Sequence, residues 1–141
     1  MDMNTFKQEV ILYSKEIGID KIGFTSATAF TELKGRLVRQ QELDYQSGFE
    51  EADIEKRVRP ELIFDKPQSI ISIALAYPSK LKDAPQSTKG ERRGIFCRAS
   101  WGTDYHAVLR NKLQLLEDFI KDKVPGAVAK SMVDTGELSD R

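Results

Sequence analysis

The sequence predicts an α+β fold, with α/β character, in which helices cover a central sheet. Two observations support this prediction. Segments with helical periodicity alternate with short β-rich runs along the 141 residues, as in chains that pack a sheet against helices. The length fits one domain, and the 40% of hydrophobic residues is enough for a packed core.

The chain begins with a predicted helix and strand. Apolar residues recur at helical spacing from Phe6 to Ile17, and Gly18 ends the pattern. Asn4 or Thr5 is expected to cap this helix. The segment 21–25, with the sequence KIGFT, is a short strand candidate.

The next part of the chain is predicted to be helical and then charged. The segment 30–45 has a helical pattern that Gly35 weakens. The segment 46–59 is charged and is expected to be a loop that contains a short helix, with Pro60 marking its boundary.

Three strands and one long helix are predicted in the second half. The segment 69–77, SIISIALAY, is nearly continuously apolar, as expected for a strand covered on both faces. The segments 94–101 and 127–133 are predicted to be further strands. Between them lies a long helix that ends at Pro125-Gly126. Its apolar stripe contains Leu109, Leu113, Leu116 and Ile120.

Charge and cysteine content exclude several classes of protein. The 22 basic and 22 acidic residues give no net charge, which argues against a generic nucleic-acid-binding tail. No apolar run reaches the roughly 20 residues of a membrane span, and residues 1–5 lack the features of a signal peptide. The single cysteine, Cys97, suits a reducing cytoplasm and excludes an internal disulfide. One thiol also cannot hold an iron–sulfur cluster that needs four.

Reactive groups gather between residues 98 and 110, where a predicted strand leads into the long helix. Ligands often bind at such a junction in open α/β sheets. Thr103 or Asp104 is expected to cap the helix, and the only histidine, His106, follows Tyr105. The alternative is structural, with a cap, a packed Tyr105 and an exposed His106. Adjacent helix positions do not face one another, so Asp104 beside His106 is a weak signal.

Three other residues have both a functional and a structural interpretation. Asp134 follows the apolar pair at 132–133 and is either an acid at a strand end or a turn residue. Cys97, within a predicted apolar strand, is expected to be an inert buried residue. Arg57 and Arg59 either contact phosphate or pair with acidic residues at positions 53 and 55.

Three segments together resemble one protein family. They are RVRPELIFDKPQSIISIALAYPS, RASWGTDYHAVLR and KSMVDTGELSDR, in this order. They resemble the amino-terminal region of bacterial epoxyqueuosine reductases, and the similarity spans nearly the whole chain.

The resemblance implies that residues 1–141 are the amino-terminal part of a cobalamin-binding catalytic domain. Members of the family reduce epoxyqueuosine in tRNA to queuosine with cobalamin and 4Fe–4S clusters, fed by an electron donor. The cluster domain and the tRNA-binding helical repeats are expected to lie outside this chain. The fragment alone is then expected to be inactive, and the full-length protein to be a cytoplasmic monomer without membrane contact.

The resemblance also implies roles for particular residues. Asp134 matches the family's general acid, a role that requires a desolvated pocket to raise its pKa from about 3.9. Arg57 and Cys97 match positions that contact the corrin, and Asp134 is also expected to contact the cofactor. Tyr105, His106 and Arg141 are candidates for substrate or cofactor contact, and His106 for a proton relay to Asp134.

One competing hypothesis comes from another functional class. The loop 79–93 and Arg98 carry an excess of basic residues, which can bind an anion. The chain would then be a non-catalytic α/β binding or interaction module for an anionic partner.

Overall fold

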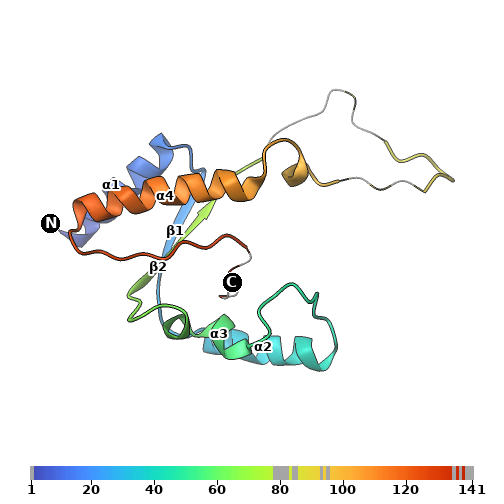
Figure 1. The fold of residues 1–141 in the computed structure, drawn as a ribbon, viewed down its shortest axis with the longest axis horizontal. Helices are drawn as coiled ribbons and strands as arrows, with labels where there is room; N and C mark the ends of the chain where they lie inside the picture. The colour runs from blue at the N-terminus through green and yellow to red at the C-terminus, as the bar shows by residue number, and fades with distance from the viewer. Residues whose placement is uncertain are drawn as a thin grey trace. The chain divides into compact units, whose positions relative to one another are not determined.

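The chain divides into two units in the computed structural model (Figure 1). The structure describes residues 2–77, 83, 86–92, 94, 96–134, 136 and 138. The first unit contains Met1–Lys21 and Ala74–Ala127, and the second contains Ile22–Ile73 and Val128–Arg141.

The first unit is built on two helices, α1 (Met3–Glu16) and α4 (Tyr105–Lys123). The two helices are in contact, and each buries an apolar residue of its predicted periodic pattern, Val10 (1% exposed) in α1 and Leu116 (3% exposed) in α4. The rings of Tyr13 and Phe119 stack with centroids 4.2 Å apart.

The ends of these helices follow the predicted signals with one correction. The cap of α1 is Asp2, whose side chain accepts a hydrogen bond from Thr5 N (3.2 Å), rather than Asn4 or Thr5. A carboxylate at this position satisfies an otherwise unpaired N–H of the first turn. The cap of α4 is Asp104, and the helix ends before Pro125.

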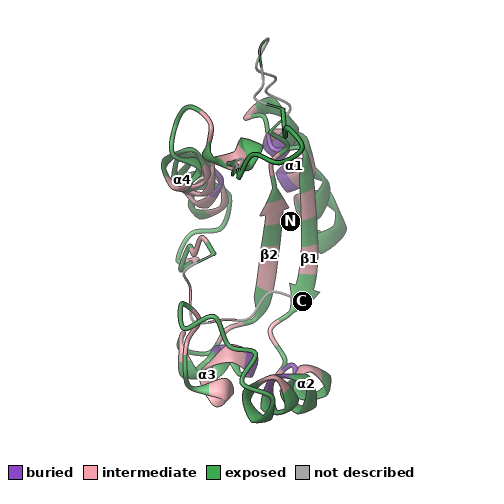
Figure 2. Ribbon diagram, turned by 90° about the vertical axis from the view of Figure 1, so that its right-hand side faces the viewer, coloured by how far each residue is buried: buried purple, intermediate pink, exposed green. Residues whose placement is uncertain are grey.

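Two strands form an antiparallel sheet, β1 (Lys21–Ser26) and β2 (Ser69–Ala74). The arrows run in opposite directions in Figure 2, and Ala27 N donates to Gln68 O (3.4 Å) beyond the strand ends. Both strands were predicted, but the complete burial expected for β2 is wrong. Its residues are exposed or half-buried because the described sheet has only these two strands.

The second unit also contains α2 (Thr31–Glu42), α3 (Ile54–Val58) and the 3₁₀ turn η1 (Pro60–Leu62). The core of this unit contains Phe30, Leu37 and Val58. Phe30 N donates to Val58 O (2.7 Å), which ties α3 to the start of α2. The helix predicted over 30–45 and the short helix within 46–59 are both confirmed.

Two of the predicted strands are wrong. Within 94–101, residues 98–100 form the 3₁₀ turn η2 (Arg98–Ser100), and the other described residues are irregular. Residues 127–133 run without secondary structure, and Val128 is 75% exposed. A strand needs a neighbour for its backbone hydrogen bonds, and the described residues offer none to either segment.

Candidate functional site

Arg57 is held by the short helix α3. The Asp53 side chain caps this helix by accepting from Glu55 N (2.9 Å). Val58, one residue after Arg57, is 2% exposed and anchors the end of the helix in the core. The Arg57 side chain is therefore presented, half-buried, from an element fixed at both ends.

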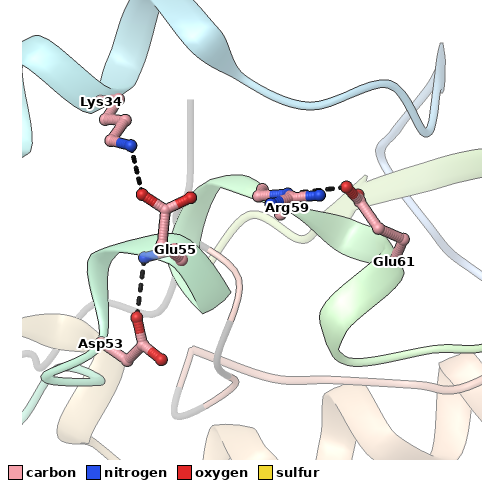
Figure 3. Close-up of polar contacts among 5 residues, drawn as sticks. All are labelled: Lys34, Asp53, Glu55, Arg59 and Glu61. Atoms are coloured by element: carbon pink, nitrogen blue, oxygen red, sulfur yellow. Dashed lines mark hydrogen bonds and ion pairs between the residues drawn. The ribbon is translucent and has the colours of Figure 1, made fainter.

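The cations around Arg57 are paired with carboxylates. Figure 3 shows Lys34 paired with Glu55 and Arg59 paired with Glu61 (2.8 Å). The third pair joins Lys56 and Glu51 (3.8 Å). The Arg59 guanidinium lowers the pKa of the Glu61 carboxyl through its hydrogen bond. Among the described residues, no carboxylate lies within ion-pair distance of Arg57. Of the two alternatives for these arginines, pairing with acidic residues applies to Arg59, whose pKa is raised mainly by Glu61 and also by Glu55. The charge of Arg57 is available for an anionic or carbonyl ligand.

Asp134 lies on a tight loop rather than at a strand end. Its φ angle is 21°, and its side chain is exposed after the half-buried Met132 and Val133. A Cβ atom added at Gly136 would lie 2.9 Å from both Cβ and Sδ of Met132, so the chain turns back closely here. The desolvation expected for a general acid is not provided by the described residues.

The segment 130–138, which contains Asp134, contacts other residues of the second unit at both of its ends. Lys130 Nζ donates to Ile63 O (3.2 Å), and Leu138 packs against the cluster that contains Val58. The element that presents Arg57 and the loop that presents Asp134 therefore share one small apolar core.

The start of α4 brings three side chains of the first unit together. Asp104 Oδ1 accepts a hydrogen bond from His106 N (2.9 Å) and lies 2.9 Å from His106 Nδ1. The rings of Tyr105 and His106 stack with centroids 4.2 Å apart. Asp104 beside His106 was only a weak signal in the sequence, yet the two residues interact, because the capping residue lies outside the helix and its side chain folds back over the first turn.

Cys97 is not the buried strand residue that was expected. It is an exposed free thiol at the start of η2, and its Sγ lies 3.7 Å from Ser100 Oγ. The hydrogen bond with Ser100 lowers the pKa of the thiol. Arg141, the last predicted contact residue, lies outside the described residues.

The predicted site residues are divided between the two units. Arg57 and Asp134 belong to the second unit, and Cys97, Tyr105 and His106 to the first. The proton relay from His106 to Asp134 therefore stays a prediction. The described residues contain no group of three or more side chains that could hold a metal ion. None of the helices in the described part of the chain has the length and apolar character of a membrane span.

One pocket of about 170 Å³ lies on the first unit, between α1 and α4. Its lining contains Glu9, Leu12, Tyr13, Glu16, Phe119 and Lys123. The predicted site residues do not line it, and its volume is below the roughly 300–1,000 Å³ of typical ligand sites.

Two features of these segments were missed in the sequence. The first is the contact of Asp104 with His106, for which the D-x-H spacing at a helix start is the available signal. The second is the close approach of Gly136 to Met132, which only the glycine after Asp134 indicates.

Comparisons with known proteins agree on one family. Residues 57–135 match the family described as "Epoxyqueuosine reductase QueG, DUF1730". The epoxyqueuosine reductase of Bacillus anthracis is 67% identical over all 141 residues, which span 37% of its length.

Solved structures give the same result. A crystal structure of epoxyqueuosine reductase with an epoxyqueuosine-modified tRNA-Tyr stem loop matches 99% of the chain with a TM-score of 0.88 and 64% identity. The Bacillus subtilis reductase, with its Asp134 catalytic loop swung out of the active site, matches 99% with a TM-score of 0.86 and 62% identity. The chain covers 37% of each of these two proteins.

Proposed function

We propose, because the chain belongs to the epoxyqueuosine reductase QueG family, that it forms the amino-terminal part of the domain that reduces epoxyqueuosine in tRNA to queuosine. The observation that carries this proposal is the span of the family match. It begins at Arg57 and extends past Asp134, and so includes five of the six predicted site residues. The same membership favours a reductase over a non-catalytic binding module.

The full-length protein is proposed to use cobalamin and 4Fe–4S clusters. The chain spans only about 37% of the relatives it matches, and it has one cysteine. The cluster ligands, the sites for the electron donor and the main tRNA contacts are therefore assigned to the remaining part. We assign the protein to the cytoplasm, as a monomer.

Arg57 is the described residue that best fits a role in holding cobalamin. Its guanidinium is half-buried and lacks a carboxylate partner in the described part of the chain, so it can donate to the amide or phosphate oxygens of that cofactor. Cys97 is proposed as a second contact, from an exposed turn that allows close approach. Bound cobalamin supplies the electrons of the reduction.

Asp134 is proposed to donate a proton to the epoxide oxygen. Loss of that oxygen as water consumes two electrons and two protons, so a positioned acid speeds the reaction. An exposed carboxyl has a pKa near 3.9 and is ionised at neutral pH. Asp134 therefore has to become protonated in a more enclosed state, with the additional cover coming from substrate, cofactor and the remainder of the protein. The Bacillus subtilis relative supports a loop with more than one position.

The experiment uses the full-length protein reconstituted with cobalamin and clusters under anaerobic conditions. It is given a reductant and tRNA that contains epoxyqueuosine, and queuosine is measured by mass spectrometry of the digested tRNA. Formation of queuosine with cobalamin, and none without it, supports the proposal. Equal formation without cobalamin would contradict it.

A matched pair of variants tests the role of Arg57. Arg57→Gln is expected to weaken cobalamin binding by about 10-fold, the effect of losing one charged hydrogen bond of roughly 1.5 kcal/mol. Lys56→Gln, on the same helix but paired with Glu51, is the control and is expected to bind cobalamin like the parent. Equal affinities of the two variants would contradict the assignment.

A further inference from the structure

Asp134 lies in a segment that has no regular secondary structure in its described residues. Its φ angle of 21° is positive, which residues other than glycine rarely adopt. Such a backbone conformation persists only where the surrounding structure holds the chain in place. Since the described residues 127–134 form no helix or strand, contacts outside regular elements have to provide this restraint.

Two contacts to the second unit lie four residues from Asp134, one on each side. Lys130 Nζ donates to Ile63 O (3.2 Å), and the Leu138 side chain packs against the apolar core of this unit. Four residues span at most about 14 Å, so a fixed Leu138 confines Asp134 to a small region.

Leu138 restrains the loop more closely than Lys130 does. The Lys130 hydrogen bond is exposed, so water competes with it, and it comes from a long, flexible side chain. Leu138 is half-buried and packs against buried apolar side chains. Packing of this kind holds a side chain in one rotamer and one place.

The core that receives Leu138 also supports Arg57. Its buried residues include Val58, which directly follows Arg57 at the end of α3. Leu138 and Arg57 are thus attached to the same small apolar group. Loss of the Leu138 contact would therefore move Asp134 relative to Arg57 without removing either residue.

We propose that Leu138 is a positioning residue, whose packing on this core fixes the place from which Asp134 reaches the substrate. This inference rests on the proposed reductase function and deepens it, because it assigns the placement of the acid to an apolar side chain that does not react. A catalytic group displaced by about 1 Å can lose about 100-fold in rate. The loop without its anchor is therefore expected to be slow even though every reacting group is present.

The first test measures the anchor without the reaction. Hydrogen–deuterium exchange of the full-length protein is followed by mass spectrometry of the peptide that contains residues 130–138. Leu138→Ala is expected to exchange faster in this peptide than the parent, because a loop without its anchor opens more often. Exchange at the parent rate in Leu138→Ala would overturn the proposal.

The matched control removes the same side chain elsewhere in the same core. Leu33, in α2, also packs against this core but is not part of the Asp134 loop. Leu33→Ala is expected to lower the urea midpoint of unfolding, as Leu138→Ala does, and to leave the exchange of residues 130–138 like that of the parent. Equally fast exchange of this peptide in both variants would mean that Leu138 is an ordinary core residue.

The second test compares turnover of the full-length variants, with kcat expressed per bound cobalamin so that unfolded molecules do not contribute. Leu138→Ala is expected to lower kcat by about 10-fold or more and to leave KM for epoxyqueuosine tRNA unchanged, because the main tRNA contacts are assigned to the remaining part of the protein. Leu33→Ala is expected to have the kcat of the parent. An equal loss of kcat in both variants, or no loss in Leu138→Ala, would refute the positioning role.

Two conservative substitutions complete the series. Leu138→Met conserves the apolar volume and is expected to have a kcat close to that of the parent. Leu138→Val lacks one carbon and is expected to lie between the parent and Leu138→Ala. A methionine variant as slow as the alanine variant would overturn the proposal. A parent protein without reductase activity would instead count against the proposed function, while the exchange measurement still decides whether Leu138 anchors the loop.

Discussion

Replacing Gly136 by alanine tests whether the loop of Asp134 depends on a close backbone approach. The added Cβ would lie 2.9 Å from both Cβ and Sδ of Met132. The Sδ atom can rotate away, but the Cβ atom moves only with the backbone, so the loop itself has to open. Overpacking of this kind typically costs about 1–3 kcal/mol.

The matched control is the same substitution at Gly35, in the interior of α2. A Cβ there meets no atom within 4 Å, and alanine favours a helix over glycine by roughly 0.8–1 kcal/mol. Gly136→Ala is therefore expected to destabilise and Gly35→Ala to stabilise. Urea unfolding of the parent and both variants measures the two signs.

The same pair of variants tests the importance of the loop for catalysis. A displacement of about 1 Å in a catalytic group can cost about 100-fold in rate. Gly136→Ala is expected to reduce turnover of epoxyqueuosine tRNA strongly, and Gly35→Ala is expected to turn over like the parent. If Gly136→Ala has parent stability and parent turnover, the reasoning about this loop is refuted.

Three further predictions follow from the packing and the electrostatics. Val58→Ala removes two buried carbons from the core that carries Arg57, so it should lower the unfolding free energy by about 1.5–3 kcal/mol in urea titrations, and a loss below about 0.5 kcal/mol would contradict the core assignment. The pKa of Asp104 is lower in the folded protein than the value of about 3.9 expected in the unfolded chain, so the ionised carboxylate stabilises the fold above that pH. This stabilisation is lost as the pH falls through the pKa of the folded state. The difference in Tm between the parent and Asp104→Asn should therefore shrink from pH 7 to pH 3, whereas a constant difference would argue against the ionised pair. Ser100→Ala should raise the pKa of Cys97 and slow its alkylation near neutral pH, and an unchanged pH profile of alkylation would exclude the hydrogen bond as the cause.

The helices could be predicted from the sequence because their signals are local. Periodic apolar residues predict the burial of Val10 in α1 and of Leu116 in α4, and Pro125-Gly126 marks the end of α4. The predicted strands at 94–101 and 127–133 failed because strand formation depends on neighbouring strands, which a local pattern does not contain.

The residues of the candidate site stay predictions, whereas the structure shows parts of its geometry that the sequence did not predict. The motifs and the family resemblance gave Arg57 and Asp134, and the family match now includes both positions. The pairing of Asp104 with His106 depends on side-chain rotation at a helix cap, and exposure of Cys97 depends on a 3₁₀ turn in place of a strand. The D-x-H spacing at a helix start only hints at the first detail, and the second depends on how the chain packs.

The general-acid role of Asp134 is tested most directly by single-turnover reduction with Asp134→Asn in the full-length protein. Asparagine has almost the same shape but no acidic proton to donate. With cobalamin still bound, as its visible spectrum reports, the rate of queuosine formation is expected to fall by about 10²–10⁴-fold. A rate equal to that of the parent, with cobalamin bound in both proteins, would show that another group supplies the proton.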